Sequence, residues 1–456
     1  MARRADGVSV KSVPVLTIGL VLTALYVGAL VWSMDRADYS VWMALLLAPL
    51  LIVITLPSLR RQAARERDAR LYRLLSFALA IKLLSTLVRF SAAFGLYGGT
   101  PDATAYHQWG IDIAANFRSF VFETGLPDLH STRFIRFFTG ILYTGVGPTK
   151  LGGFLLFSWL GFLGLFLLYR AFVIAVPEGR SRTYARFIFF VPSMLFWPSS
   201  IGKEAWMILA IGIASFGIAR AFTDNLKRGI VPLVAGMWMV GVVRPHVAAM
   251  LGVGLAAAYL LKPTDHRQRH EMSPVVKGVV LGVIGLGSLL LIQRTDNFLR
   301  EAGVKEEEGG ITDALEQTTF RTQQGGSGFS PSVLDSPQRA PIAVVTVLFR
   351  PLLPEAGNLQ TVLASLEGSV LFLWAVWRWQ WILAALKSIR RQPYVAMAIA
   401  YMGVFIFGFS SIANFGILAR QRVQVLPFLF VLLAIPPRDG GENPERRPAA
   451  ALEQVG

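Results

Sequence analysis

The chain has 456 residues, of which 54% are hydrophobic and 16% are charged, and its mean hydropathy is +0.52. This composition excludes an ordinary soluble globule and is typical of a polytopic membrane protein. The lack of cysteine excludes a disulfide framework and thiol chemistry. The formal net charge is +16, but there is no arginine-rich tail with interleaved aromatic residues, so no nucleic acid partner is expected.

The first apolar run begins near Val13 and follows three basic residues, Arg3, Arg4 and Lys11. It lacks an A-x-A cleavage site before the next polar residues, so we predict a membrane helix rather than a removed signal peptide. A span needs about 20 mainly apolar residues. The sequence therefore predicts about twelve spans, which start near residues 13, 41, 74, 151, 186, 204, 230, 246, 275, 358, 394 and 421.

Basic residues fall in every second connection between these spans. Lys and Arg collect in short cytoplasmic loops of membrane proteins. With a cytoplasmic N-terminus, the cytoplasmic segments are the basic ones: 60–73, 180–186, 227–228, 262–277, 387–391 and the tail 438–456. We therefore predict an all-α, polytopic integral membrane protein, a single transmembrane domain over 1–456, with both termini in the cytoplasm.

Two connections are long, at 94–150 and 294–357, and both fall outside the cell under this topology. In the first, the stretch IDIAANFRSFVFETGL (111–126) is expected to form an amphipathic helix that lies on the membrane. The apolar residues that can share its face are Ile111, Ile113, Phe117, Phe120 and Val121. Large outer loops beside small inner ones indicate recognition or chemistry on the outer face.

The second long connection has the composition of a surface loop. It contains the acidic KEEEGG (305–310) and the glycine- and glutamine-rich TQQGGSGF (322–329), so we expect a mobile segment. No internal repeat and no separate soluble domain is visible in the sequence.

Ionisable side chains at membrane depth are costly and usually line a cavity. By the predicted topology, most of those in this chain lie at the outer ends of spans. They are Asp102, Tyr106 and His107 in TPDATAYHQWG, Lys203 and Glu204 in FWPSSIGKEAWM, Arg244 and His246 in VVRPHVAAM, Arg350 in LFRPLLPEAGN, and Arg420 and Arg422 in NFGILARQRVQVLP.

Each of these residues also has a purely structural interpretation. A single arginine at a helix end is usually an anchor that reaches the interface. Lys203 and Glu204 can pair with each other at a helix start, and Asp102 can cap a helix that begins near Ala103. The joint pattern favours function, because tight outer turns have no topological reason to be basic. We therefore expect the cations to form an anion site.

A phosphate or diphosphate is the anion that these side chains suit. Arginine binds phosphate through two parallel hydrogen bonds, and lysine supplies a compact charge. At a membrane boundary such an anion indicates a lipid head group. The pattern predicts no metal site and identifies no cofactor.

Asp102 lies in the first large outer loop, four residues before Tyr106 and ahead of the predicted helix 111–126. This layout, over about the first 250 residues, resembles the membrane glycosyltransferases of the GT-C superfamily, with D-x-x-x-Y as the shared local motif. The first loop lacks the paired acidic motif of that superfamily. The stretches LFWPSSIGKEAWM, VRPH, LFRPLLPEAGN and LARQR resemble polytopic proteins of bacterial polysaccharide export and Wzy-type polymerases, which hold polyprenyl diphosphate with arginines.

The resemblance implies a glycosyltransferase in a bacterial plasma membrane that assembles cell-envelope or exopolysaccharide. The partners would be membrane lipids, a polyprenyl-phosphate-linked sugar as donor and a glycan or lipid as acceptor. Asp102 would be the general base, with the cations on the leaving phosphate. In a Wzy-like polymerase, Glu204 or His246 would take the role of the base.

Two alternatives come from other classes of protein. A transporter or flippase of lipid-linked glycans often has inverted repeats and broken helices at mid-membrane. Here the charges cluster at the outer ends instead and no repeat is visible. A non-catalytic scaffold for envelope assembly would be favoured by long amphipathic soluble segments, which the sequence lacks.

Overall fold

The computed structural model of the chain describes residues 13–36, 38–96, 102–223, 226–261 and 328–437, the last range without 330, 332–333, 335 and 358. Over these residues the protein is all α-helical, as predicted, with seventeen α-helices and one isolated bridge between Gly328 and Asn414. Several predicted features lie outside the described residues: the span near 275, the segment 305–310, most of 322–329 and the tail 438–456.

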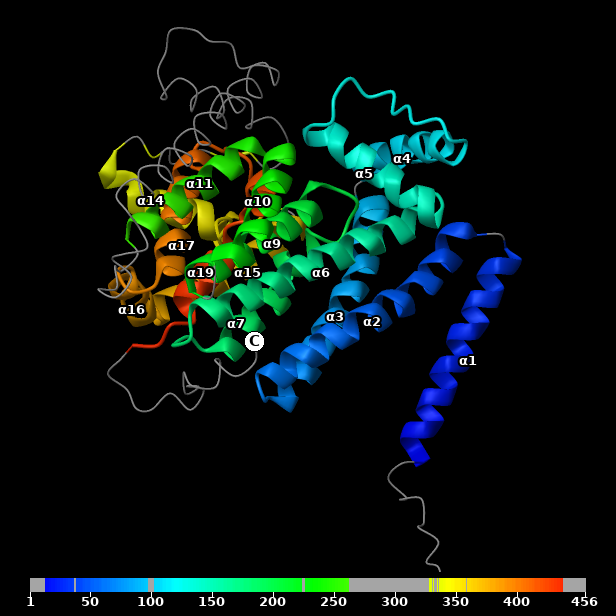
Figure 1. The fold of residues 1–456 in the computed structure, drawn as a ribbon, viewed down its shortest axis with the longest axis horizontal. Helices are drawn as coiled ribbons and strands as arrows, with labels where there is room; N and C mark the ends of the chain where they lie inside the picture. Colours follow the sequence, from blue (N-terminus) through cyan, green and yellow to red (C-terminus); the bar gives the residue numbers. More distant parts are fainter. Residues whose placement is uncertain are drawn as a thin grey trace, which may run out of the picture.

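Three N-terminal helices form one edge of the molecule: α1 (Val13–Asp35), α2 (Tyr39–Arg65) and α3 (Ala69–Ser91). Aspartate side chains fix the starts of α2 and α3. The Asp38 carboxylate accepts a hydrogen bond from the Val41 N–H at 3.3 Å, and Asp68 accepts one from the Arg70 N–H at 2.9 Å. Figure 1 shows α2 and α3 as a hairpin, with α1 standing apart at the right.

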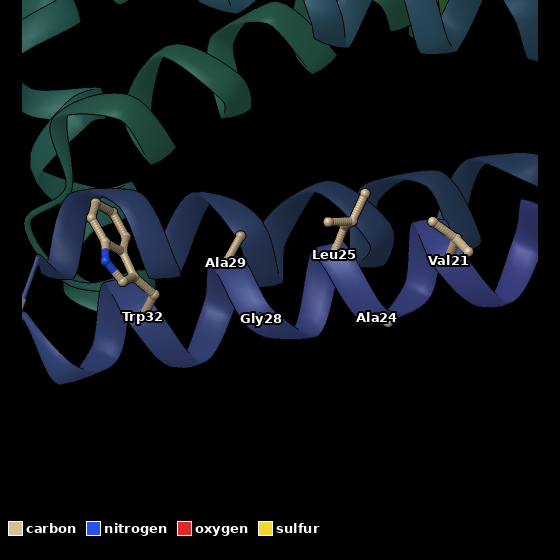
Figure 2. A pocket seen from close by; sticks show the side chains of 6 residues that line it. All are labelled: Val21, Ala24, Leu25, Gly28, Ala29 and Trp32. Atoms are coloured by element: carbon tan, nitrogen blue, oxygen red, sulfur yellow. The ribbon is translucent and has the colours of Figure 1, made fainter.

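Helix α1 carries many exposed apolar side chains. The exposed fraction is 66% for Leu25 and 55% for Trp32. Figure 2 shows the shallow hollow along this helix, which is lined by Val21, Ala24, Leu25, Gly28, Ala29 and Trp32. A surface of this kind on a 23-residue helix suits contact with lipid chains.

The first long connection folds into two helices that pack on each other, α4 (Asp102–Arg118) and α5 (Ser131–Val146). Glycines permit the close approach: a Cβ at Gly140 would lie 2.6 Å from the Cβ of Ile113. In Figure 1 the pair lies at the end of the bundle remote from the α2–α3 turn.

The helix predicted over 111–126 is therefore misplaced. The helix begins at Asp102 and ends at Arg118, and Phe120 and Val121 lie in the turn and coil that follow. Phe120 has a φ of 58°, a left-handed conformation that ends helices. Ile113 is only 1% exposed and contacts α5. The residues of the predicted apolar face therefore do not share one face: Ile113 packs inside the α4–α5 pair, whereas Phe120 and Val121 lie in the loop.

The centre of the bundle contains four apolar helices: α6 (Lys150–Ala175), α9 (Lys203–Thr223), α10 (Leu226–Val243) and α11 (Pro245–Leu260). Glycines bring α9 against α6 and α10. A Cβ at Gly212 would collide with the backbone of Gly164 in α6, and one at Gly236 would collide with that of Ala214 in α9. Small-residue contacts of this kind are typical of helix pairs in membranes.

Two short helices, α7 (Ser181–Phe190) and α8 (Pro192–Phe196), precede α9. Residues 198–202, between α8 and α9, are buried although they are not helical. Lys82 of α3, itself 1% exposed, donates hydrogen bonds to the Met194 carbonyl at 3.0 Å and the Leu195 carbonyl at 2.8 Å. These bonds satisfy carbonyls left open where α8 ends. The stretch predicted as an outer turn thus contains a buried, non-helical connection between α8 and α9.

The C-terminal part contains six further helices: α14 (Ala340–Phe349), α15 (Leu359–Trp377), α16 (Trp379–Ser388), α17 (Pro393–Phe409), α18 (Phe415–Arg422) and α19 (Leu426–Leu433). Short 3-10 turns lie at Pro337–Arg339 and Leu353–Glu355. Helix α17 packs along α11, which joins this part to the centre of the bundle.

Five helical segments are long and apolar enough to cross a membrane: α2, α3 with the π-helical turn that follows it, α6, α9 and α10. Two bent pairs, α15 with α16 at 67° and α18 with α19 at 59°, each have the length and composition of one more span. The described residues thus contain five to seven candidate spans, the helices of a multi-pass membrane protein. Helices also occur where spans were predicted near 13, 186, 246 and 394, and among these α11 and α17 are apolar but shorter.

Two of the basic connections, 60–73 and 180–186, lie together at one end of the bundle. The Arg182 guanidinium, at the start of α7, donates two hydrogen bonds to Asp68 in the α2–α3 turn, at 2.7 and 2.9 Å. The Arg180 N–H donates to the carbonyl of Ala434 after α19 at 2.8 Å. We call this the basic end, defined by the connections 60–73 and 180–186.

Candidate anion-binding site

Glu204 lies at the centre of a group of charges at the other end of the bundle. It stands in the first turn of α9 and is 3% exposed. Its Oε1 accepts a hydrogen bond from Arg244 Nη2 at 2.8 Å, and Arg420 Nε lies 2.6 Å from the same oxygen. A buried carboxylate requires such partners, because an isolated buried charge is strongly unfavourable.

Arg244 stands at a break between two helices, and Arg420 stands near the end of a short helix. Arg244 separates α10 from α11, because Pro245 cannot continue α10 but suits the first position of α11. Arg420 stands in the last turn of α18, whose start is capped by the Asn414 side chain accepting from the Ile417 N–H at 3.1 Å. The Arg244 side chain is 7% exposed and that of Arg420 is 29% exposed.

Asp102 and Lys203 extend the group toward solvent. Arg420 Nη1 donates to Asp102 Oδ2 at 3.1 Å, and the Asp102 side chain is 64% exposed. Lys203 Nζ donates to the Ser131 hydroxyl at 3.0 Å. We call Asp102, Lys203, Glu204, Arg244 and Arg420 the charge cluster. It holds three cations and two carboxylates, so its formal charge favours an anion.

Tyr106 and His246 lie beside the cluster. Tyr106 is 2% exposed and hydrogen bonds with Thr132 at the start of α5. Burial, with the negative charge of Asp102, raises the pKa of the Tyr106 hydroxyl to about 12. The positive charges of Arg244 and Lys203 act on His246. The centroid of the His246 ring lies 6.1 Å from that of Phe409.

The other candidate residues lie elsewhere. His107 Nδ1 is 2.7 Å from the hydroxyl of Tyr143, and burial, followed by the charge of Lys150, lowers the pKa of His107 to about 4. His107 is therefore uncharged at neutral pH, and its contact with the Tyr143 hydroxyl joins α4 to α5. It follows Tyr106 in a helix, so the two side chains point about 100° apart.

Arg350 and Arg422 belong to a second polar group. Arg350 pairs with Glu355, and its guanidinium lies over the ring of Phe329, 4.5 Å from the centroid. Arg422, 1% exposed, donates to the carbonyls of Leu348 at 3.3 Å and Arg350 at 3.1 Å. These bonds attach α18 to the end of α14, so we interpret both arginines as structural.

Two contributors could not be identified from the sequence, Ser131 and Thr132. They follow the coil after α4 in a polar stretch that contains no local motif. Ser131 has a φ of 52°, a left-handed conformation that is uncommon for a residue other than glycine. Such outliers persist where the surrounding structure holds them in place.

Two groups of the charge cluster are available to a ligand, the Arg244 Nη1 atom and the Asp102 carboxylate. Within the described part of the chain, Arg244 Nη1 is buried and makes no hydrogen bond. Asp102 presents an exposed carboxylate on the solvent side of the cluster. The described ranges contain no group of three His, Asp or Glu residues that could hold a metal ion. The geometry suits the binding of an anion next to an exposed carboxylate.

Comparison of the chain with protein-family models, with curated proteins and with solved structures finds no match.

Proposed function

We propose that the protein is a membrane glycosyltransferase that uses a polyprenyl-phosphate- or diphosphate-linked sugar on the outer face of the membrane. The observation that carries the proposal is the convergence of Asp102, Lys203, Glu204, Arg244 and Arg420 from four separate parts of the chain. The excess of cations suits the phosphate of the donor. The acceptor is a hydroxyl group of a glycan or a lipid.

In the proposed reaction, the acceptor oxygen forms a bond with the anomeric carbon of the donor sugar. The bond between that carbon and the phosphate oxygen breaks, and the electron pair leaves with the phosphate. Arg244 and Lys203 stabilise the charge that develops on the leaving group. Asp102 takes the proton of the acceptor hydroxyl.

We assign a different role to Glu204. Both arginines use its Oε1, so the carboxylate is held in its ionised form and is poorly suited to accept a proton. Glu204 therefore acts as a positioning residue, which fixes the two guanidinium groups. His246, next to Arg244 and Lys203, lines the same site.

The proposal includes the finer topology. The chain crosses a bacterial plasma membrane about twelve times, with both termini in the cytoplasm. The basic end faces the cytoplasm and the charge cluster faces the outside. The opposite placement of the two ends in the bundle supports this orientation under the positive-inside rule.

The test is transfer by membrane vesicles from cells that make the Asp102→Asn variant, with a synthetic polyprenyl-phosphate-linked sugar as donor. We expect transfer to fall roughly 10²–10⁴-fold, which is the contribution of a general base, while the amount of protein in the membrane is unchanged. The matched control is Asp128→Asn, in the coil before α5, where the carboxylate pairs with Arg133. Near-normal transfer by Asp102→Asn would show that the base is another residue.

One observation favours a second function, transport of a lipid-linked glycan. Helices α7 and α8 are short and are separated at Val191, and the buried Lys82 donates hydrogen bonds to carbonyls near the end of α8. Broken helices with buried charges are typical of transporters. Vesicles that move a fluorescent lipid-linked glycan between leaflets, without forming a new glycosidic bond, would favour this function. Products of increasing glycan length would identify a Wzy-like polymerase instead.

A further inference from the structure

Three arginines from three helices meet at the basic end, far from the charge cluster. Arg65 is the last residue of α2, Arg170 stands near the end of α6, and Arg220 is in the last turn of α9. We call these the arginine group. Helices α2 and α9 both pack along α6, which brings the three side chains to one place.

Two of the guanidinium groups share one aromatic ring. The Cζ atom of Arg170 lies 4.6 Å from the ring centroid of Phe216, and that of Arg220 lies 4.9 Å from the same centroid. Arg170 also lies 6.0 Å from the ring of Phe166. Stacking on aromatic faces fixes the planes of the guanidinium groups and leaves their edges available for hydrogen bonds.

One carboxylate lies near the group: Glu66 follows Arg65 and accepts hydrogen bonds from Gln62 and Tyr169, but within the described residues it forms no ion pair with the three arginines. The charges that act on Arg170 are those of Arg65 and Arg220, both cations. Across the described ranges, no ion pair joins any of the three to an aspartate or glutamate. The Nε atom of Arg220 is buried and makes no hydrogen bond there. Three like charges at close range favour an anion between them.

We propose that Arg65, Arg170 and Arg220 bind a phosphate group, and that its source is an anionic phospholipid. Arginine edges match the paired oxygens of a phosphate, and basic pockets between helices on the cytoplasmic side bind such lipids. Arg220 stands three residues before the end of α9 and Arg170 five before the end of α6. At 1.5 Å per residue these positions are about 5 and 8 Å inside the helix ends, near the depth of head groups. This inference takes the cytoplasmic placement of the basic end from the proposed topology, and it does not depend on the proposed glycosyl transfer.

The test compares lipid binding by the purified full-length chain in detergent, measured by native mass spectrometry with phosphatidylglycerol and with phosphatidylcholine. We expect the parent to prefer phosphatidylglycerol. The Arg170→Gln/Arg220→Gln variant should weaken phosphatidylglycerol binding roughly tenfold or more for each lost contact. The matched control is Arg36→Gln, because Arg36 also lies over an aromatic ring, 4.4 Å from the centroid of Trp32, but belongs to the α1–α2 connection.

A second arm separates the two sources of phosphate. Inorganic phosphate is titrated against the lipid: displacement of phosphatidylglycerol at millimolar phosphate would identify a phosphate-ion site on the same arginines. Equal phosphatidylglycerol binding by the parent and the double variant would overturn the proposal. If the glutamine variant does not fold, Arg170→Lys/Arg220→Lys keeps the charge and removes the paired donors. We expect weaker binding from it, and binding equal to the parent would also overturn the proposal.

Discussion

A single carboxylate oxygen holds two arginines together in this protein. Glu204 Oε1 contacts Arg244 and Arg420, and Arg420 reaches on to Asp102, so positive and negative groups alternate along the contact. The surroundings of Glu204 and Arg244 exclude water, which strengthens each attraction and makes an unpaired member strongly unfavourable.

This arrangement predicts that Glu204→Gln destabilises the fold. The variant leaves Arg244 and Arg420 facing each other without the carboxylate, and breaking a buried pair removes about 3–5 kcal/mol of stability. The measurement is the thermal unfolding midpoint of the purified protein in detergent. Adding Arg244→Gln to Glu204→Gln removes one of the opposed charges, so the double variant should recover part of the loss. A Glu204→Gln protein as stable as the parent would contradict the buried pairing.

The sequence could indicate the members of the cluster but not their contacts. Asp102, Lys203, Glu204, Arg244 and Arg420 were all recognisable as charges at the ends of apolar runs. Their pairing depends on how helices pack, because Asp102 and Arg420 are 318 residues apart in sequence. For the same reason the sequence did not separate Arg422 from the cluster. Arg422 follows Arg420 by two positions in a helix, so its side chain points about 200° away and donates to the carbonyls of Leu348 and Arg350.

At the scale of the elements, small residues decide which helices become neighbours. The backbone of α9 meets that of α6 at Gly212 and Gly164, and this contact sets the direction in which α9 presents Glu204. The long apolar runs predicted α2, α3, α6, α9 and α10 well. A span was predicted near 186, but its division into the short helices α7 and α8 was not, because it depends on buried contacts such as those of Lys82.

We predict that Gly212→Ala destabilises the protein, because the added methyl group would collide with the backbone of Gly164. Overpacking of this kind removes about 1–3 kcal/mol. The matched control is Gly403→Ala in α17, where a Cβ would meet no atom within 4 Å. Alanine has the higher helix propensity, so this control should leave stability unchanged or raise it by up to about 1 kcal/mol. Thermal unfolding of both variants provides the comparison, and equal midpoints would contradict close packing of α6 and α9.

At the scale of the whole molecule, the two ends of the bundle differ in character. Arginine-rich connections gather at the basic end, and the charge cluster with the α4–α5 pair occupies the other. The alternation of basic connections along the chain predicted this division. The way α4 and α5 pack on each other was not predictable, since it depends on contacts such as that between Ile113 and Gly140.

The proposed orientation predicts the labelling of single cysteines, which the natural chain allows because it contains none. Glu123→Cys, exposed between α4 and α5, should react with a membrane-impermeant maleimide in intact spheroplasts. Arg70→Cys, exposed at the start of α3, should react only after the membrane is permeabilised. The reverse pattern would invert the orientation, and labelling of both in intact spheroplasts would contradict the separation of the two ends.

Because the ribosome makes the chain from its N-terminus, the contacts of the charge cluster form in a fixed order. Glu204 and Arg244 are 40 residues apart, so they can pair soon after α10 emerges. Asp102 must wait for Arg420, 318 residues later, which corresponds to roughly 15–60 s at usual rates of synthesis. The charge cluster is therefore completed only when α18 enters the membrane, and a chain cut before α18 would retain the Glu204–Arg244 pair without Arg420.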